Sequence, residues 1–246
     1  MTGSSARLLS PFCALLLCTV VMRAQEVNVS GRIELQSAGT KPKAMRASGA
    51  VVWLEQVPGT TDIPIPTAPA NTPGPLRLTQ RNKSFEPHLL VVPVGAAVEF
   101  PNRDPFFHNV FSLFEGKRFD LGLYEAGTTR SVHFDRVGIS YIFCNIHPEM
   151  SAVVVALNTP YYGISDQRGD IVIPGVPPGR YVLHVWHQSS LPESLNLLSR
   201  QVTVSQAENS IGVVRLTATD LPSTHKNKYG RDYDRPTPAS PAYARP

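Results

Sequence analysis

Apolar and polar residues alternate over short stretches of this chain, and glycine or proline separates most of the stretches. A period of two places the apolar side chains on one face of an extended strand. The pattern predicts strands at residues 29–35, 50–54, 89–92, 97–100, 110–113, 129–134, 139–144, 152–157, 164–173, 180–187, 200–205 and 211–216. Residues 191–198 allow one helical turn. We therefore expect an all-β protein built from sandwiches or barrels.

The length of 246 residues is enough for two small β modules. The chain holds 23 prolines, and a cluster of them predicts an extended linker over residues 58–76, because proline lacks a backbone donor. We expect one module over residues 77–157 and a second over residues 158–217. From residue 221 to residue 246 the chain is polar and rich in proline, which predicts a disordered tail.

Residues 1–24 have the pattern of a secretory signal peptide. Arg7 precedes an apolar run over residues 8–22, and Ala24 is a small residue at the expected cleavage site. The run is shorter than the roughly 20 residues that a membrane-spanning helix needs. No other stretch is apolar enough to span a bilayer. We expect a secreted or periplasmic protein without a transmembrane segment.

The formal net charge of +4 does not indicate nucleic-acid binding. Arg7 and Arg23 belong to the signal peptide, and the tail holds five basic and two acidic residues. The folded body is therefore close to neutral and lacks the basic patch that a phosphate backbone requires. We expect no nucleic-acid partner.

Export leaves Cys144 as the one cysteine of the mature chain, because Cys13 and Cys18 lie in the signal peptide. No disulfide can form within one chain, and a lone thiol outside the cytosol is either buried and inert or bound. Cys144 starts a C-x-x-H-x-x-M motif that continues to His147 and Met150, directly after an expected strand.

His108 lies 36 residues before Cys144, at the end of a turn-rich segment. Two imidazoles, one thiolate and a distant thioether are the ligands of a blue-copper centre. Zinc would accept the cysteine and the histidines but has little use for methionine. The four residues therefore predict one copper ion that cycles between Cu(I) and Cu(II). A Cys–His hydrolase would need a third group to orient the pair, and the sequence suggests none.

The module over residues 77–157 resembles the cupredoxins, in particular the amicyanin and plastocyanin type. The resemblance rests on the C-x-x-H-x-x-M spacing and on motifs in the family's order: Phe85-x-Pro87, Val92-x-x-Gly95, Val98-x-Phe100-x-Asn102 and His108-Asn109. It implies a Greek-key β-sandwich or barrel, with His108, Cys144, His147 and Met150 as metal ligands. It further implies that Asn109 ties the two ligand loops together beside the sulfur.

One departure from the family concerns the aromatic residues before the cysteine. The family usually places them two and four positions upstream, where this chain has Ile142 and Ser140. Tyr141 and Phe143 are one step out of phase and lie on the opposite face of the strand. The packing under the site is therefore expected to differ from that of the family.

The second module resembles the carboxypeptidase regulatory-like, or transthyretin-like, β-sandwiches. The matching motifs are Asp166-x-x-Gly169-x-Ile171-x-Ile173 and Val176-Pro-Pro-Gly179-x-Tyr181-x-Leu183. Such motifs specify a fold and no activity. Such a module normally begins with two further strands, which we expect at Gly31–Leu35 and Ala50–Leu54 within residues 27–57. The cupredoxin-like module would then be inserted into a split sandwich. The alternative assigns residues 27–57 to the cupredoxin-like module.

The leading interpretation is an exported one-electron carrier that is not an enzyme. Phe106, Phe107, Ile146 and Pro148 would form an apolar rim for brief contact with an unidentified redox protein. Two alternatives are a copper storage or delivery protein and a cell-surface structural β module without redox activity. His184 and His187 fall on opposite faces of one strand, and His88, His133 and His225 are interpreted as surface or hydrogen-bonded residues.

Overall fold

The computed structural model describes residues 25–38, 43–59, 75–113, 116–219 and 225–233 of the chain. The expected signal peptide, most of the expected linker and most of the expected tail lie outside these residues. The described residues form strands and one short helix, α1 (Pro192–Asn196), so the all-β prediction is confirmed. No helix among them is long and apolar enough to cross a membrane.

One unit, the inserted sandwich, spans residues 76–157. Its larger sheet has the order β10-β9-β12-β13-β7, a second sheet has the order β11-β8-β4, and β5 and β6 form a hairpin. The strands are β4 (Leu76–Arg77), β5 (Thr79–Arg81), β6 (Ser84–Glu86), β7 (Leu89–Pro93), β8 (Ala97–Pro101), β9 (His108–Ser112), β10 (Phe119–Tyr124), β11 (Thr129–His133), β12 (Gly138–Cys144) and β13 (Ser151–Leu157). Phe85, Phe100, Tyr124, Phe134 and Ile142 are fully buried in its core.

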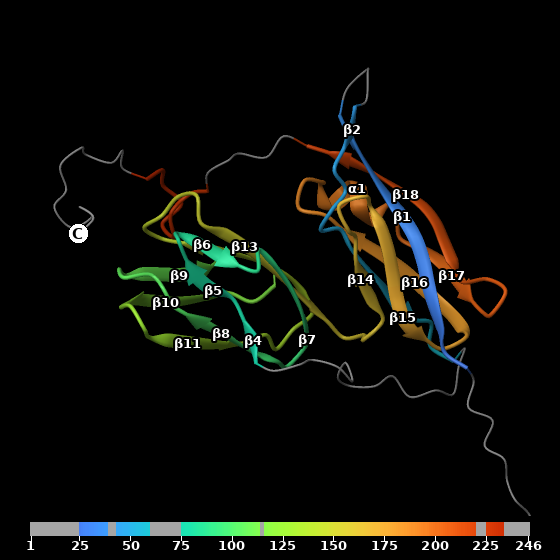
Figure 1. Cartoon of the computed structure of the whole chain (residues 1–246), viewed down its shortest axis with the longest axis horizontal. Helices are drawn as coiled ribbons and strands as arrows, with labels where there is room; N and C mark the ends of the chain where they lie inside the picture. The colour runs from blue at the N-terminus through green and yellow to red at the C-terminus, as the bar shows by residue number, and fades with distance from the viewer. Residues whose placement is uncertain (1–24, 39–42, 60–74, 114–115, 220–224, 234–246) are drawn as a thin grey trace, which may run out of the picture.

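The other unit, the split sandwich, is built from both ends of the chain. One sheet has the order β15-β1-β18 with β2 beside β1, and the other has the order β14-β3-β16-β17. The strands are β1 (Val27–Ser37), β2 (Ala44–Met45), β3 (Val51–Gln56), β14 (Tyr162–Ile164), β15 (Asp170–Val176), β16 (Gly179–Trp186), β17 (Arg200–Val204) and β18 (Ser210–Ala218). Figure 1 shows the two units side by side.

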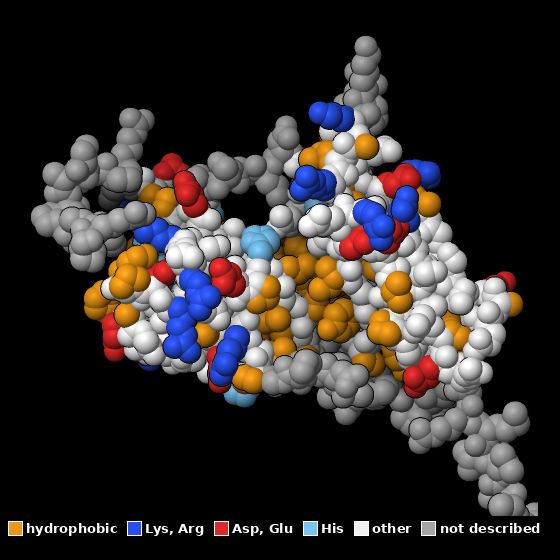
Figure 2. Space-filling model, viewed as in Figure 1, with side chains coloured by type: hydrophobic (Ala, Val, Ile, Leu, Met, Phe, Trp, Pro, Cys, Tyr) orange, Lys and Arg blue, Asp and Glu red, His pale blue; other side chains and the backbone are white. Residues whose placement is uncertain are grey.

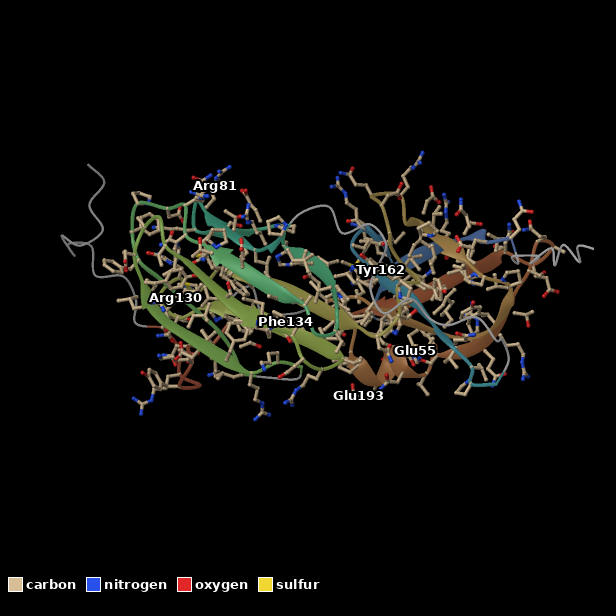
Figure 3. The ribbon with its side chains drawn as sticks, turned by 90° about the horizontal axis from the view of Figure 1, so that it is seen from below. Glu55, Arg81, Arg130, Phe134, Tyr162 and Glu193 are labelled. Carbon is tan, nitrogen blue, oxygen red and sulfur yellow. The ribbon has the colours of Figure 1, made fainter. Side chains whose placement is uncertain are left out.

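The N-terminal strands pair with strands from the far end of the chain. β1 pairs with β15 in antiparallel and with β18 in parallel orientation, and β3 lies between β14 and β16. Of the two assignments considered for residues 27–57, the structure therefore has these strands in the split sandwich. Figure 3 shows Arg81, Arg130 and Phe134 in the inserted unit, and Glu55, Tyr162 and Glu193 in the split unit.

The expectation of one continuous strand over residues 164–173 is wrong. A turn separates β14 from β15, because Asp166 Oδ1 accepts hydrogen bonds from the backbone N–H groups of Arg168 and Asp170, at 2.8 and 2.9 Å. Gly169 completes the turn with a φ of +82°, and a Cβ there would lie 2.2 Å from the carbonyl oxygen of Ile33. The local side-chain bond therefore prevails over the strand pattern.

The two faces of β12 meet different surroundings. Ile142 and Cys144 point into the core of the inserted sandwich, whereas Tyr141 and Phe143 point outward. The ring centroid of Tyr141 lies 6.4 Å from that of Trp186 in the split sandwich. The same apolar cluster joins Val153 and Val155 of β13 to the split sandwich. Figure 2 shows hydrophobic side chains gathered where the two units meet.

Candidate metal centre

Three strand ends bring the sequence-predicted ligands together. His108 begins β9, Cys144 ends β12, and Met150 directly precedes β13. β12 is antiparallel to both β9 and β13, so the start of one strand lies beside the end of its neighbour. The loop from Cys144 to Met150, called here the ligand loop, connects β12 to β13 at this edge.

The ligand atoms of His108, Cys144 and His147 all lie within 4.8 Å of one another, and all three side chains are buried. Nδ1 of His108 and Nδ1 of His147 each lie 3.5 Å from Cys144 Sγ. Within the described part of the chain, this is the one group of three His, Cys, Asp or Glu side chains with such spacing.

Backbone hydrogen bonds close the ligand loop around Met150. The N–H of Met150 donates to the carbonyl of His147 at 3.1 Å, and its carbonyl accepts from the N–H of Cys144 at 3.2 Å. The Met150 side chain is 1% exposed and packs in the same core as Cys144. The fourth predicted ligand therefore belongs to the same short turn as the cysteine and the second histidine.

Asp104 is a site residue that the sequence interpretation missed. Its carboxylate accepts a hydrogen bond from His108 Nε2 at 2.9 Å, and also accepts from the backbone N–H groups of Asn82 and Lys83. Burial alone would raise the pKa of Asp104, but these hydrogen bonds lower it below its usual value. An ionised Asp104 thus keeps the proton of His108 on Nε2 and leaves Nδ1 facing the thiol. The sequence signal that could have identified Asp104 is its position four residues before His108.

Burial sets the protonation of the three central groups in the metal-free protein. It lowers the pKa of His147 to about 4, with a further lowering from His108. It also lowers the pKa of His108, although Asp104 opposes the shift. Burial raises the pKa of the Cys144 thiol, and backbone hydrogen bonds, including one from Asn109, offset part of this rise. Neutral imidazoles are ready to bind a metal, and metal binding would displace the thiol proton.

Asn109 connects the two ligand-bearing segments through its backbone. Its carbonyl accepts a hydrogen bond from the N–H of Asn145 at 2.8 Å, which joins β9 to the ligand loop. Its side-chain Nδ2 instead donates to Asp120 Oδ1 at 2.6 Å. The side chain is therefore used to anchor β10 rather than to bridge the two loops.

The four rim residues differ in exposure. Phe106 packs against both histidines, with ring centroids 5.3 Å from His108 and 5.5 Å from His147. Phe107 is 50% exposed, whereas Ile146 and Pro148 are half-buried. Phe107 thus offers the largest exposed apolar surface of the four.

The described part of the expected tail, residues 225–233, lies against the ligand loop, where the sequence predicts disorder. His225, interpreted as a surface or hydrogen-bonded residue, bonds through Nδ1 to the Lys226 carbonyl and stacks on Phe143 with ring centroids 4.3 Å apart. Tyr233 Oη donates a hydrogen bond to the carbonyl of Cys144 at 2.8 Å. The outward position of Phe143 was the one sequence signal that something must cover this face.

The donor set fits copper. A buried thiol, two imidazole Nδ1 atoms that face it and a buried thioether combine soft and borderline ligands, which suit both oxidation states of copper. Asp104 orients one imidazole, as carboxylates commonly do for metal-binding histidines. The other histidines do not join this group: His88 and His187, for example, bond to the protein elsewhere.

Comparison with known proteins finds similarity to solved structures only. No family model and no curated protein matches the chain. A copper-containing nitrite reductase from Thermus scotoductus SA-01 is 26% identical over 35% of this chain and 23% of that chain, with a TM-score of 0.33. A purple cupredoxin from Nitrosopumilus maritimus is 22% identical over 33% of this chain and 99% of that chain, with a TM-score of 0.31. An oxidized amicyanin variant is 24% identical over 34% of this chain and 83% of that chain, with a TM-score of 0.32.

Proposed function

We propose that this chain is an exported blue-copper protein that carries single electrons with one copper ion. The observation that carries the proposal is the buried Cys144 Sγ with the Nδ1 atoms of His108 and His147 each at 3.5 Å. An unpaired cysteine is unusual in an exported chain, and metal binding would account for its presence. The cupredoxin resemblance of residues 77–157 supports the same conclusion.

His108, Cys144 and His147 would hold the copper, with Met150 as the weak fourth ligand. Bound there, copper would supply a centre that accepts and returns one electron. Asp104 would keep the His108 ring in one orientation, and backbone N–H groups around Cys144 would donate hydrogen bonds that stabilise the thiolate. The buried position of all three central ligands would exclude water, so little has to rearrange when the charge changes.

The partner would be another redox protein that contacts the exposed end of the site. Phe107 is 50% exposed beside Phe106, which packs on His147. A small apolar surface next to a buried ligand suits a short-lived complex, because it gives close approach without a large interface. We place the protein outside the cytosol on the strength of the signal-peptide pattern alone.

We assign the chain no catalytic reaction. Cys144 is flanked by Phe143 and Asn145, not by histidines that could bind a second copper beside the first. Substrate chemistry would need such a second centre. The split sandwich, with its carboxypeptidase regulatory-like motifs, would then serve as a scaffold for the carrier.

Copper storage or delivery is the second candidate function. It would need a site that releases the ion readily, and the buried histidines and the few methionines of the mature chain count against it. A structural β module without redox activity is the third candidate. The presence of all four ligand residues counts against this candidate, because a structural module would not need them.

The test is a visible absorption and electron-spin-resonance spectrum of the mature chain loaded with Cu(II). We expect an intense blue band and narrow copper hyperfine splitting, both lost in Cys144→Ser. His133→Gln, which changes an exposed histidine of β11, is the matched control and should keep both signals. A chain that binds no copper, or a Cys144→Ser variant with an unchanged spectrum, would overturn the proposal. Rapid loss of bound copper to a chelator would favour storage or delivery.

A further inference from the structure

Residues 225–233, called here the strap, return from the split sandwich to the inserted sandwich. The strand β18 ends at Ala218 in the split unit, yet the strap lies against the unit that carries the candidate metal centre (Figure 1). Three kinds of contact hold it there: ring packing, hydrogen bonds to the ligand loop and an ion pair.

Ring packing covers the outward face of β12. His225 stacks on Phe143 at 4.3 Å between centroids, with an angle of 27° between the rings. Phe111 of β9 meets the edge of His225 at 6.2 Å, and Tyr233 meets it at 5.4 Å. The strap therefore covers Phe143, the half-buried residue before Cys144, on the face of β12 that points away from the core of the inserted sandwich.

Hydrogen bonds tie the strap to the ligand loop at three residues. Tyr233 Oη donates to the carbonyl of Cys144 at 2.8 Å. The N–H of Lys228 donates to Asn145 Oδ1 at 2.9 Å, and the N–H of His225 donates to the carbonyl of Pro148 at 3.4 Å. The strap thus contacts the thiolate residue, the next residue and the residue after the second histidine.

Lys228 also reaches the other ligand-bearing segment. Its Nζ lies 2.7 Å from Asp120 Oδ2, and Asp120 Oδ1 accepts from the side chain of Asn109, the neighbour of His108. The Asn109 carbonyl in turn accepts from the N–H of Asn145. Lys228 therefore contacts the ligand loop directly and reaches the segment that carries His108 through Asp120 and Asn109.

The strap has a structure of its own. Asn227 Oδ1 accepts hydrogen bonds from the N–H groups of Tyr229 and Arg231, at 2.9 and 3.1 Å. The Asn227 N–H donates to the carbonyl of Arg231 at 2.8 Å. This closed turn presents Lys228 and Tyr233 to the loop in a fixed arrangement, which lowers the entropy cost of their contacts.

We propose that the strap holds the ligand loop in its metal-binding conformation, with Tyr233 and Lys228 as its positioning residues. This inference rests on the proposed copper site. The ligand loop carries three of the four proposed ligands, and release of the metal requires the loop to open. Opening the loop breaks the strap contacts as well, so the strap slows metal exchange.

The first test compares Tyr233→Phe with Tyr162→Phe in the full mature chain. Tyr233→Phe keeps the ring and removes only the hydroxyl that bonds to Cys144, whereas Tyr162 belongs to β14 of the split sandwich, outside the strap and the ligand loop. In the metal-free chain we expect the Asn145 amide hydrogen to exchange several-fold to about tenfold faster in Tyr233→Phe, and at the wild-type rate in Tyr162→Phe.

The second test loads the same variants with Cu(II) and follows transfer of the ion to an excess of chelator. We expect a similar several-fold increase in the release rate for Tyr233→Phe and for Lys228→Met. Lys226→Met is the control for the latter, because Lys226 pairs with exposed Asp232 and not with the site. The blue band of each variant should keep its intensity at saturation.

The outcomes separate the strap from the copper site. If the wild-type chain forms no thiolate–copper band, the proposed function fails, and amide exchange alone decides whether the strap positions the loop. If the band forms but both the exchange rate and the release rate of Tyr233→Phe and Lys228→Met equal those of the controls, the inference is overturned.

Discussion

His108 donates a hydrogen bond from Nε2 to Asp104 Oδ2 at 2.9 Å, and the opposite ring nitrogen faces Cys144 Sγ at 3.5 Å. The Asp104 carboxylate also accepts two backbone N–H groups, from Asn82 and Lys83. It therefore has a fixed position independent of His108. A carboxylate held in this way sets both the tautomer and the direction of the imidazole before any metal arrives.

Asp104→Asn is expected to weaken copper binding about 10- to 100-fold, because the amide leaves the His108 tautomer undefined. It also removes an acceptor from buried donors, which costs about 1–3 kcal/mol of unfolding free energy. Competition with a chelator of known affinity measures the first effect, and urea unfolding measures the second. Asp135→Asn, which breaks an exposed ion pair with Lys117, is the control. Unchanged copper affinity in Asp104→Asn would show that the carboxylate does not orient the ligand.

Met150→Leu is expected to raise the reduction potential and keep the blue colour. A thioether donates weakly to Cu(II), so its removal favours Cu(I). Leucine nearly matches methionine in volume, and the unfolding free energy of the metal-free chain should change by less than about 1.5 kcal/mol. Voltammetry of the loaded protein measures the potential. Loss of copper binding, or a lowered potential, would contradict the proposed role of Met150.

Trp186→Ala is expected to lower the unfolding free energy by about 3–5 kcal/mol, because it opens a cavity where the two sandwiches meet. Trp186 is 6% exposed and packs 6.4 Å from Tyr141, which is part of β12. Urea unfolding measures the effect, and amide exchange in the inserted sandwich shows whether it reaches that unit. Leu197→Ala, at an 86% exposed position, should change stability by less than about 0.5 kcal/mol. A similarly small loss in Trp186→Ala would mean that the two units do not support each other.

His187 makes the metal-free chain less stable in acid. Burial lowers the pKa of His187 below its ordinary 6.5, although the contact of Nε2 with the Ser48 carbonyl opposes the shift. Just below pH 6.5, His187 is therefore protonated in most unfolded chains but stays neutral in the folded chain. The stability contributed by the neutral ring is complete above that pH and is lost as the pH falls toward the folded-state pKa.

We therefore expect His187→Gln to reduce the loss of stability between pH 6.5 and pH 5, measured by urea unfolding across that range. His108 and His147 are also shifted downward by burial, so a part of the acid sensitivity should remain. His133→Gln, at an exposed position, is the control and should leave the slope unchanged. A steeper slope in His187→Gln would contradict the assignment.

Strand prediction succeeded where apolar, β-forming residues lie between turn residues. The expected strands over residues 89–92, 97–100 and 139–144 correspond to β7, β8 and β12. It missed Phe119–Tyr124, which forms β10 with Gly122 at a φ of +68° and an irregular register between Asp120 and Leu123. Pairing with β9 and the ionised Asp120, whose side chain bonds to Asn109, stabilise that strand. These contacts come from segments that no local pattern includes.

The sequence by itself determined the β class and selected the residues that gather at one sheet edge. It could do so because strand alternation is local, and because a thiol, two imidazoles and a thioether in this order have a specific chemistry. Only the tertiary structure decided that β3 pairs with β16, that Asp104 holds His108, and that residues 225–233 cover Phe143. Each of these is a contact between distant segments, and the local sequence of one segment does not identify the segment that it contacts. Such contacts depend on which apolar sheet faces are buried against each other, and this is defined only in the folded chain.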